Sequence, residues 1–87
     1  MSYRLATGVG LEESEGSIYL APLPGGPILV LEGVAALIFT EATTGDPEHL
    51  AERILEQVHG PPDEIAAHVA AFIDDLVARG LLIEGSA

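Results

Sequence analysis

Apolar and polar positions divide the chain into a strand-like first third and a helical remainder. Between Tyr3 and Leu31, short apolar runs are separated by turn-forming residues, which is typical of strands. In residues 17–20, side chains alternate so that Ile18 and Leu20 share one face of a predicted strand. Beyond residue 33, apolar side chains recur every three or four positions, which indicates helices.

Residues 28–31, Ile-Leu-Val-Leu, form an apolar strand that does not alternate. Either both of its faces are covered inside the fold, or one face is left for a ligand. Prolines at positions 22, 24 and 27 precede this strand, and proline cannot donate a hydrogen bond to a neighbouring strand. The prolines therefore favour a position at the edge of a sheet.

The first helix is predicted over residues 33–43, directly after this strand. Its apolar stripe consists of Val34, Leu37 and Ile38, and Thr44–Gly45 ends it. The second helix is predicted to start with Asp46 as N-cap and Pro47 as its first residue, and to end at Gly60. Its stripe consists of Leu50, Ile54 and Val58.

The third helix is predicted from near Pro62 to Gly80. Asp63 and Glu64 fall in its first turn, where the helix dipole favours anions. One face of this helix is apolar and comprises Ile65, Val69, Phe72, Ile73 and Leu76. Strands followed by three helices in 87 residues predict one α+β domain spanning residues 1–87, with a winged helix-turn-helix-like fold.

The net charge of -11 argues against the usual ligand of a winged helix, which is DNA. The chain has 14 Asp and Glu residues, three Arg residues and no Lys, so it cannot build a cationic patch for phosphates. A basic peptide or the basic face of a partner protein complements this charge better. Neither a secretory signal nor a membrane-spanning run is apparent, so we expect a soluble cytoplasmic protein.

Residues for catalysis or for metal binding are not arranged in a recognisable pattern. The chain has no cysteine, and His49, His59 and His68 lack partners at ligand spacing, so we interpret them as surface residues. Asp74 and Asp75 point about 100° apart on a helix and cannot share one substrate. We therefore predict a non-catalytic protein without a metal or other cofactor.

One flank of the third helix carries polar residues beside the apolar face. Glu64, His68, Ala71, Asp75 and Arg79 fall there on a helical wheel. This flank is either an ordinary solvated surface or one wall of a groove whose other wall is the strand at residues 28–31. In the second case, an extended peptide would add to the strand edge through main-chain hydrogen bonds.

Three segments resemble the PqqD-like domain, also called the RiPP recognition element. They are residues 28–34, the helix break at Gly45–Asp46, and the apolar pattern of residues 64–82. The resemblance implies a three-stranded antiparallel sheet packed on three helices, which captures the leader segment of a ribosomally made precursor peptide. The leader would lie beside the third strand and against the third helix. His68 departs from the pattern, since many relatives have Asp there, and the run from Pro24 to Pro27 is also unusual.

The resemblance leads us to expect a leader-binding protein that presents a precursor to a separate maturation enzyme, as in lasso peptide pathways, where that enzyme is a leader protease. The residues predicted to bind the leader are Ile28, Leu29, Val30, Leu31, His68, Ala71, Phe72 and Asp75. Two other functions remain open: a PqqD-type chaperone for a radical enzyme, and an acidic winged-helix module that docks on a protein without capturing a strand. A DNA-binding regulator is disfavoured by the charge.

Overall fold

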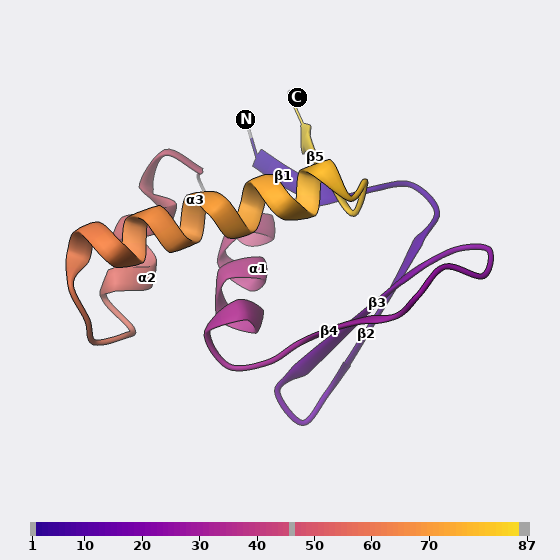
Figure 1. The fold of residues 1–87 in the computed structure, drawn as a ribbon, viewed down its shortest axis with the longest axis horizontal. Coiled ribbons are helices and arrows are strands. Elements are labelled where there is room, and N and C mark those ends of the chain that lie inside the picture. Colours follow the sequence, from indigo (N-terminus) through magenta and orange to yellow (C-terminus); the bar gives the residue numbers. More distant parts are fainter. Residues whose placement is uncertain (1, 46, 86–87) are drawn as a thin grey trace.

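A computed structural model describes residues 2–45 and 47–85 of the chain. Strands dominate the first third and helices the rest, as the apolar pattern predicted (Figure 1). The elements are β1 (Ser2–Leu5), β2 (Val9–Ser14), β3 (Ser17–Pro22), β4 (Leu29–Leu31), α1 (Val34–Thr44), the 3-10 helix η1 (Pro47–His49), α2 (Leu50–Leu55), α3 (Pro62–Ala78) and β5 (Leu82–Gly85).

The sheet of β2, β3 and β4 is antiparallel and three-stranded, which confirms the expected α+β fold. Ile18 pairs with Leu31 and Leu20 with Leu29, so these four side chains share the inner face of the sheet. Ile18 and Leu20 are buried, as their alternation predicted. The paired part of β4 is shorter than the apolar run, because the ladder ends at Leu29 and leaves Ile28 outside it.

A second, two-stranded sheet was not predicted. The strands β1 and β5 pair antiparallel, with Leu5 opposite Leu82, and bring the two ends of the described chain together (Figure 1). Each strand is only four residues long, so neither carries enough alternation to identify its partner from sequence.

Helix α1 follows β4 after only Glu32 and Gly33, and its bounds agree with the prediction within one residue. Its buried side is formed by Ala36, Ile38, Phe39 and Ala42. Val34 differs from the expected stripe, because its side chain at the start of the helix is 44% exposed.

The second helical segment is shorter than predicted. It begins as the 3-10 turn η1, and α2 ends at Leu55, so Gly60 does not cap it. The chain continues as turns, in which the Val58 amide donates to the Ile54 carbonyl, and Val58 still packs against the core. The predicted N-cap, Asp46, lies outside the described residues.

Helix α3 ends as the sequence predicted, at Gly80. The Leu81 amide donates to the Leu76 carbonyl and the Gly80 amide to the Val77 carbonyl, which is the Schellman arrangement. Gly80 has φ +76°, a left-handed conformation that glycine adopts without a steric penalty. This turn directs Leu81 and Leu82 back into the core, where both are buried.

The core lies where α1, α2 and α3 meet the inner face of the three-stranded sheet and β5. Its largest fully buried side chains are Leu20, Ile38, Ile54, Leu76 and Leu82. At its edge, Arg53 of α2 ties to α1: Nε donates to the Glu41 carboxylate over 2.9 Å, and a terminal nitrogen donates to the Glu41 carbonyl over 3.0 Å. Gln57 donates to the same carboxylate. The hydrogen bonds from Arg53 and Gln57 hold the pKa of Glu41 below its usual value.

Candidate peptide-binding groove

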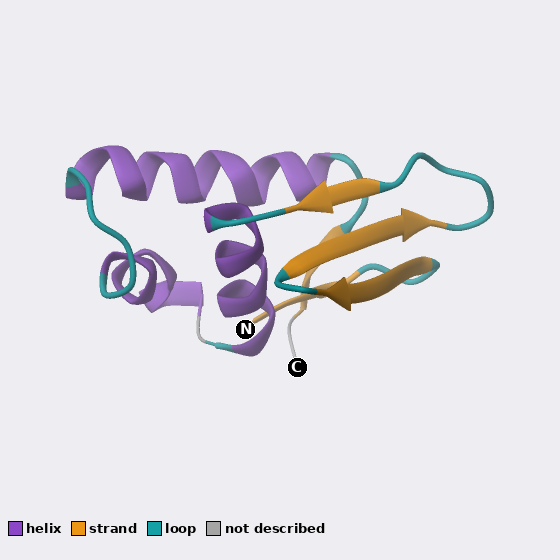
Figure 2. Ribbon diagram, turned by 90° about the horizontal axis from the view of Figure 1, so that it is seen from below, coloured by secondary structure: helices purple, strands orange, loops and turns teal. Residues whose placement is uncertain are grey.

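Strand β4 has a free edge on the side of helix α3. In the sheet order β2-β3-β4, it pairs with β3 alone among the described residues, so its other edge presents main-chain groups that no described strand pairs with. Figure 2 shows β4 as the strand of this sheet nearest to α3, and the two elements lie toward the same face of the molecule in Figure 1. The strand edge and the helix therefore form the two sides of one surface.

The side chains around β4 decide between the two interpretations of the apolar run. Leu31 is buried and Leu29 is half-buried, whereas Val30 is 43% and Ile28 64% exposed. Val30 lies opposite Tyr19 on the outer face of the sheet, and that tyrosine is also exposed. One face of the run packs on the core and the other is uncovered, so burial on both faces is excluded.

Two apolar hollows border α3, the first against α1 and the second against β4 and the residues before it. The first has a volume of about 230 Å³ and lies at the N-terminal half of α3, where Glu64, Ile65 and His68 face Val34 and Ile38 of α1. The second, about 300 Å³, lies at the C-terminal end of α3, where Arg79 and Leu81 face Ile28 and Leu29. The flank of α3 that carries Glu64, His68 and Arg79 therefore does face this surface, as the helical wheel suggested.

The predicted site residues fall into three groups in the structure. Ile28 and Leu29 line the second hollow and His68 the first. Val30 is exposed on the outer face of the sheet, Phe72 is half-buried on α3, and Ala71 and Asp75 are exposed on α3. Leu31 is 3% exposed, so its side chain belongs to the core and only its main chain can take part in binding.

Charge on this flank is partly neutralised within α3. Arg79 Nε donates to the Asp75 carboxylate over 2.9 Å, and both side chains are more than half exposed. An exposed i,i+4 pair contributes only about 0.3–0.5 kcal/mol, so a ligand can replace either partner at little cost. The helical wheel predicted both residues on this flank, but the ion pair between them was not predicted.

Val34, Val58 and Leu81 complete the hollows but were not predicted as site residues. Their apolar character had placed Val34 and Val58 in helix stripes, and only the turn from β4 into α1 brings Val34 beside α3. No signal in the sequence separates a core valine from one at the rim of a groove.

The site offers shape and main-chain hydrogen bonds, and its polar groups are few. His49, His59 and His68 are exposed. Within the described part of the chain, no three His, Asp or Glu side chains gather as they would around a metal ion. Across residues 2–45 and 47–85, no helix is long and apolar enough to cross a membrane. The arrangement suits the capture of an extended peptide.

A three-stranded sheet with an open edge beside a helix defines the class of protein by its fold, a small α+β domain. Residues 17–82 match the family described as coenzyme PQQ synthesis protein D (PqqD), and the chain belongs to that family. The match includes β4 and all of α3, the two sides of the groove. It confirms the family resemblance that the sequence carried.

Two solved structures share the fold. One is described as lasso peptide synthetase B1 complexed with the leader peptide; it is 18% identical, has a TM-score of 0.82, and the alignment covers 97% of this chain and 100% of that one. The other, TbiB1 in complex with the TbiA(beta) leader peptide, is 20% identical with a TM-score of 0.80, covering 100% and 99%. No curated protein matches the chain.

Proposed function

We propose that this protein binds the leader segment of a ribosomally made precursor peptide by β-strand addition at β4, and presents it to a separate maturation enzyme. The observation that carries the proposal is the free edge of β4 beside α3, with exposed Ile28 and Val30 next to it. The leader would form a fourth strand of the sheet, with its outer side facing α3.

Strand addition divides the work between main chain and side chains. The leader main chain would pair with β4, and alternate leader side chains would point toward the two hollows at either end of α3. Fully burying a Val or Ile side chain contributes about 1.5–3 kcal/mol. Val30 and Ile28 are 43% and 64% exposed, so only part of each side chain remains to be buried. Burying that part would contribute roughly 1 kcal/mol to the binding free energy for each residue.

The polar residues of the flank would then make only a small contribution to leader affinity. Asp75, Arg79 and His68 are all exposed, and an exposed charged contact contributes at most about 1 kcal/mol. Apolar contacts and main-chain hydrogen bonds therefore dominate. Ala71 and Phe72 would supply contact area, with Ala71 leaving space for a leader side chain.

A lasso peptide pathway is the maturation system that the proposal favours. Both fold neighbours are described as complexes with leader peptides, and one as a lasso peptide synthetase component. On this account, the partner enzyme is a leader protease, the 1–87 chain acts as a single binding domain, and the protein itself performs no chemistry. A PqqD-type chaperone that delivers a peptide to a radical enzyme is the second candidate, and the family match supports it.

Calorimetric titration with a synthetic leader peptide tests the proposal. The peptide would be the leader of a candidate precursor, with a scrambled sequence of identical composition as control. We expect saturable 1:1 binding of the leader and none of the scrambled peptide. Equal binding of both peptides would indicate nonspecific attraction to an acidic surface, and binding of neither would refute leader recognition.

A further inference from the structure

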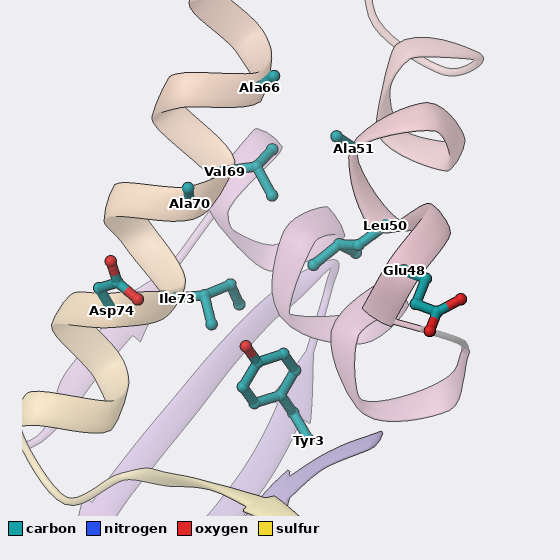
Figure 3. A pocket seen from close by; sticks show the side chains of 9 residues that line it. All are labelled: Tyr3, Glu48, Leu50, Ala51, Ala66, Val69, Ala70, Ile73 and Asp74. Carbon is teal, nitrogen blue, oxygen red and sulfur yellow. The ribbon is translucent and has the colours of Figure 1, made fainter. Parts of the chain in front are cut away.

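A third hollow, separate from the groove, lies on the opposite flank of α3 (Figure 3). It has a volume of about 240 Å³ and lies between α3, the η1–α2 segment and β1. Its lining residues are Tyr3, Glu48, Leu50, Ala51, Ala66, Val69, Ala70, Ile73 and Asp74. None of the leader-binding residues proposed above contributes to it.

The hollow has an apolar floor with polar groups around it. Leu50, Val69 and Ile73 are buried in the core beneath it, and three alanines on α2 and α3 leave it open. Figure 3 shows the Tyr3 ring rising from β1 between α3 and η1, with Asp74 on the α3 side. A side chain that enters the hollow therefore meets apolar walls first and oxygen atoms at the mouth.

The mouth of the hollow carries a negative potential. Partial burial raises the pKa of the Tyr3 hydroxyl, and the charges of Glu84 and Asp74 raise it further. Those two carboxylates therefore act on the position of the hydroxyl. A cation placed there would meet attraction from both, in addition to the attraction of a chain with net charge -11.

We propose that this hollow receives an arginine side chain of a partner protein, namely the enzyme that takes over the leader-bound precursor. An arginine stem would lie on Ala51, Ala66 and Ala70, while its guanidinium would stack on the Tyr3 ring and pair with the Asp74 carboxylate. The choice of partner rests on the proposed function, whereas the chemistry of the hollow does not.

Arginine fits this hollow better than lysine or a second copy of the chain. A planar guanidinium can stack on a ring and bind a carboxylate bidentately, which an ammonium cannot. Each copy of this chain has three arginines: Arg53 binds Glu41, Arg79 faces the leader groove, and Arg4 is exposed on β1. Two copies would also bring together surfaces of net charge -11.

The two flanks of α3 allow both ligands to bind at once. Asp74 faces the hollow, while Asp75 pairs with Arg79 on the groove side. A leader in the groove would therefore leave the hollow accessible to the enzyme. Substituting each aspartate alone removes the same charge from one flank or the other.

Nuclear magnetic resonance titration of the ¹⁵N-labelled full chain tests the chemistry of the hollow. The probe is acetyl-Gly-Arg-Gly-amide, and the matched control has citrulline, a neutral isostere, in place of arginine. We expect the arginine peptide to shift the amide signals of Ala51, Ala66 and Ala70 with a dissociation constant on the order of 1 mM. Citrulline or the Asp74→Asn substitution should weaken binding by about fivefold, and Asp75→Asn should not.

A second measurement uses a candidate precursor-processing enzyme, a leader protease. Ala70→Trp fills the hollow and should weaken binding of the enzyme to the leader-loaded protein at least tenfold, while leader affinity stays unchanged. Equal shifts with the arginine and citrulline peptides, shifts confined to other residues, or an unaltered enzyme affinity in Ala70→Trp would overturn the proposal. So would broadening of the Ala66 and Ala70 signals with protein concentration alone, which would indicate a second copy. Failure of leader binding with intact arginine binding would refute only the proposed function.

Discussion

Asp74 and Asp75 are neighbours in sequence but belong to different surfaces. Asp74 lines the hollow beside α2 and β1, whereas Asp75 pairs with Arg79 on the groove side. The rotation of about 100° per helical residue separates them. At the scale of single residues, a substitution of one aspartate therefore tests one flank of α3 and leaves the other unchanged.

Asp75→Ala should weaken leader binding without unfolding the domain. The carboxylate pairs with Arg79, which lines the second hollow, and a leader strand would pass there. Because it is more than half exposed and shares its charge with Arg79, we expect at most a fivefold loss of affinity, which corresponds to about 1 kcal/mol. Calorimetric titration of both proteins with the leader peptide measures this loss.

The same titration has a stronger variant and two controls. Ala71→Trp should reduce affinity more than Asp75→Ala does, because the ring would occupy space that a leader side chain needs. Glu52 on α2 and Glu56 directly after it are exposed, and neither belongs to α3 or β4, so their alanine variants should bind normally. Weakened binding in these controls, with unaltered Asp75→Ala and Ala71→Trp, would place the ligand elsewhere.

Glu41 should make the stability of the domain depend on acidic pH. Its pKa in the folded state is lowered by hydrogen bonds from Arg53 and Gln57, so its contribution is present above its ordinary value of 4.5. That contribution is lost as the pH falls through the lowered value. Urea unfolding should therefore show Glu41→Gln to be less stable than the wild type by up to about 1 kcal/mol at pH 7. The difference should shrink toward pH 3, and a constant difference would refute the assignment.

At the scale of elements, the sequence predicted what depends on local periodicity. The alternation of Ile18 and Leu20, the apolar face of α3 and the glycine end at Gly80 all have the predicted structure. The pairing of β1 with β5 depends on contacts between strands far apart in the chain, which leave no periodic signal in the sequence. The apolar stripe of residues 50, 54 and 58 continues past Leu55, so it did not indicate that α2 ends there.

The candidate groove, whose role is a proposal, was predictable to the same extent. The helical wheel grouped Glu64, His68 and Arg79, which line the two hollows, because side-chain direction in a helix follows from sequence spacing. The exposure of Val34 and the burial of Leu31 were not predictable, because both depend on how β4 turns into α1 through Glu32 and Gly33. The apolar run indicated a strand but could not indicate which side was free.

Val30→Pro tests the role of β4 as a receiving strand. Proline has no amide hydrogen and disturbs the main chain of an edge strand, so leader affinity should fall by at least tenfold. Circular dichroism has to show unchanged helicity, and Val30→Thr, which keeps the amide and the β-branch, serves as the matched control. A folded Val30→Pro protein with normal affinity would contradict strand addition.

At the scale of the whole molecule, the net charge of -11 sets how fast a basic leader arrives. Exposed charges attract over about 10 Å at 0.1 M salt and over about 3 Å at 1 M. The association rate of a leader containing Lys or Arg should therefore fall at least tenfold between dilute and molar salt in stopped-flow measurements, with a much smaller change in the dissociation rate. A salt-independent association rate would assign the acidic surface to solubility alone.

The most direct test of strand addition alters the ligand and leaves the protein intact. Single N-methylation at successive leader residues removes one main-chain donor at a time, and calorimetry measures the affinity of each peptide. A strand that pairs with one neighbour directs every second amide toward it. Our account predicts losses of tenfold or more at alternate residues in the segment beside β4, with small effects between them. Uniform tolerance of N-methylation, or losses with a helical period of three to four residues, would contradict it.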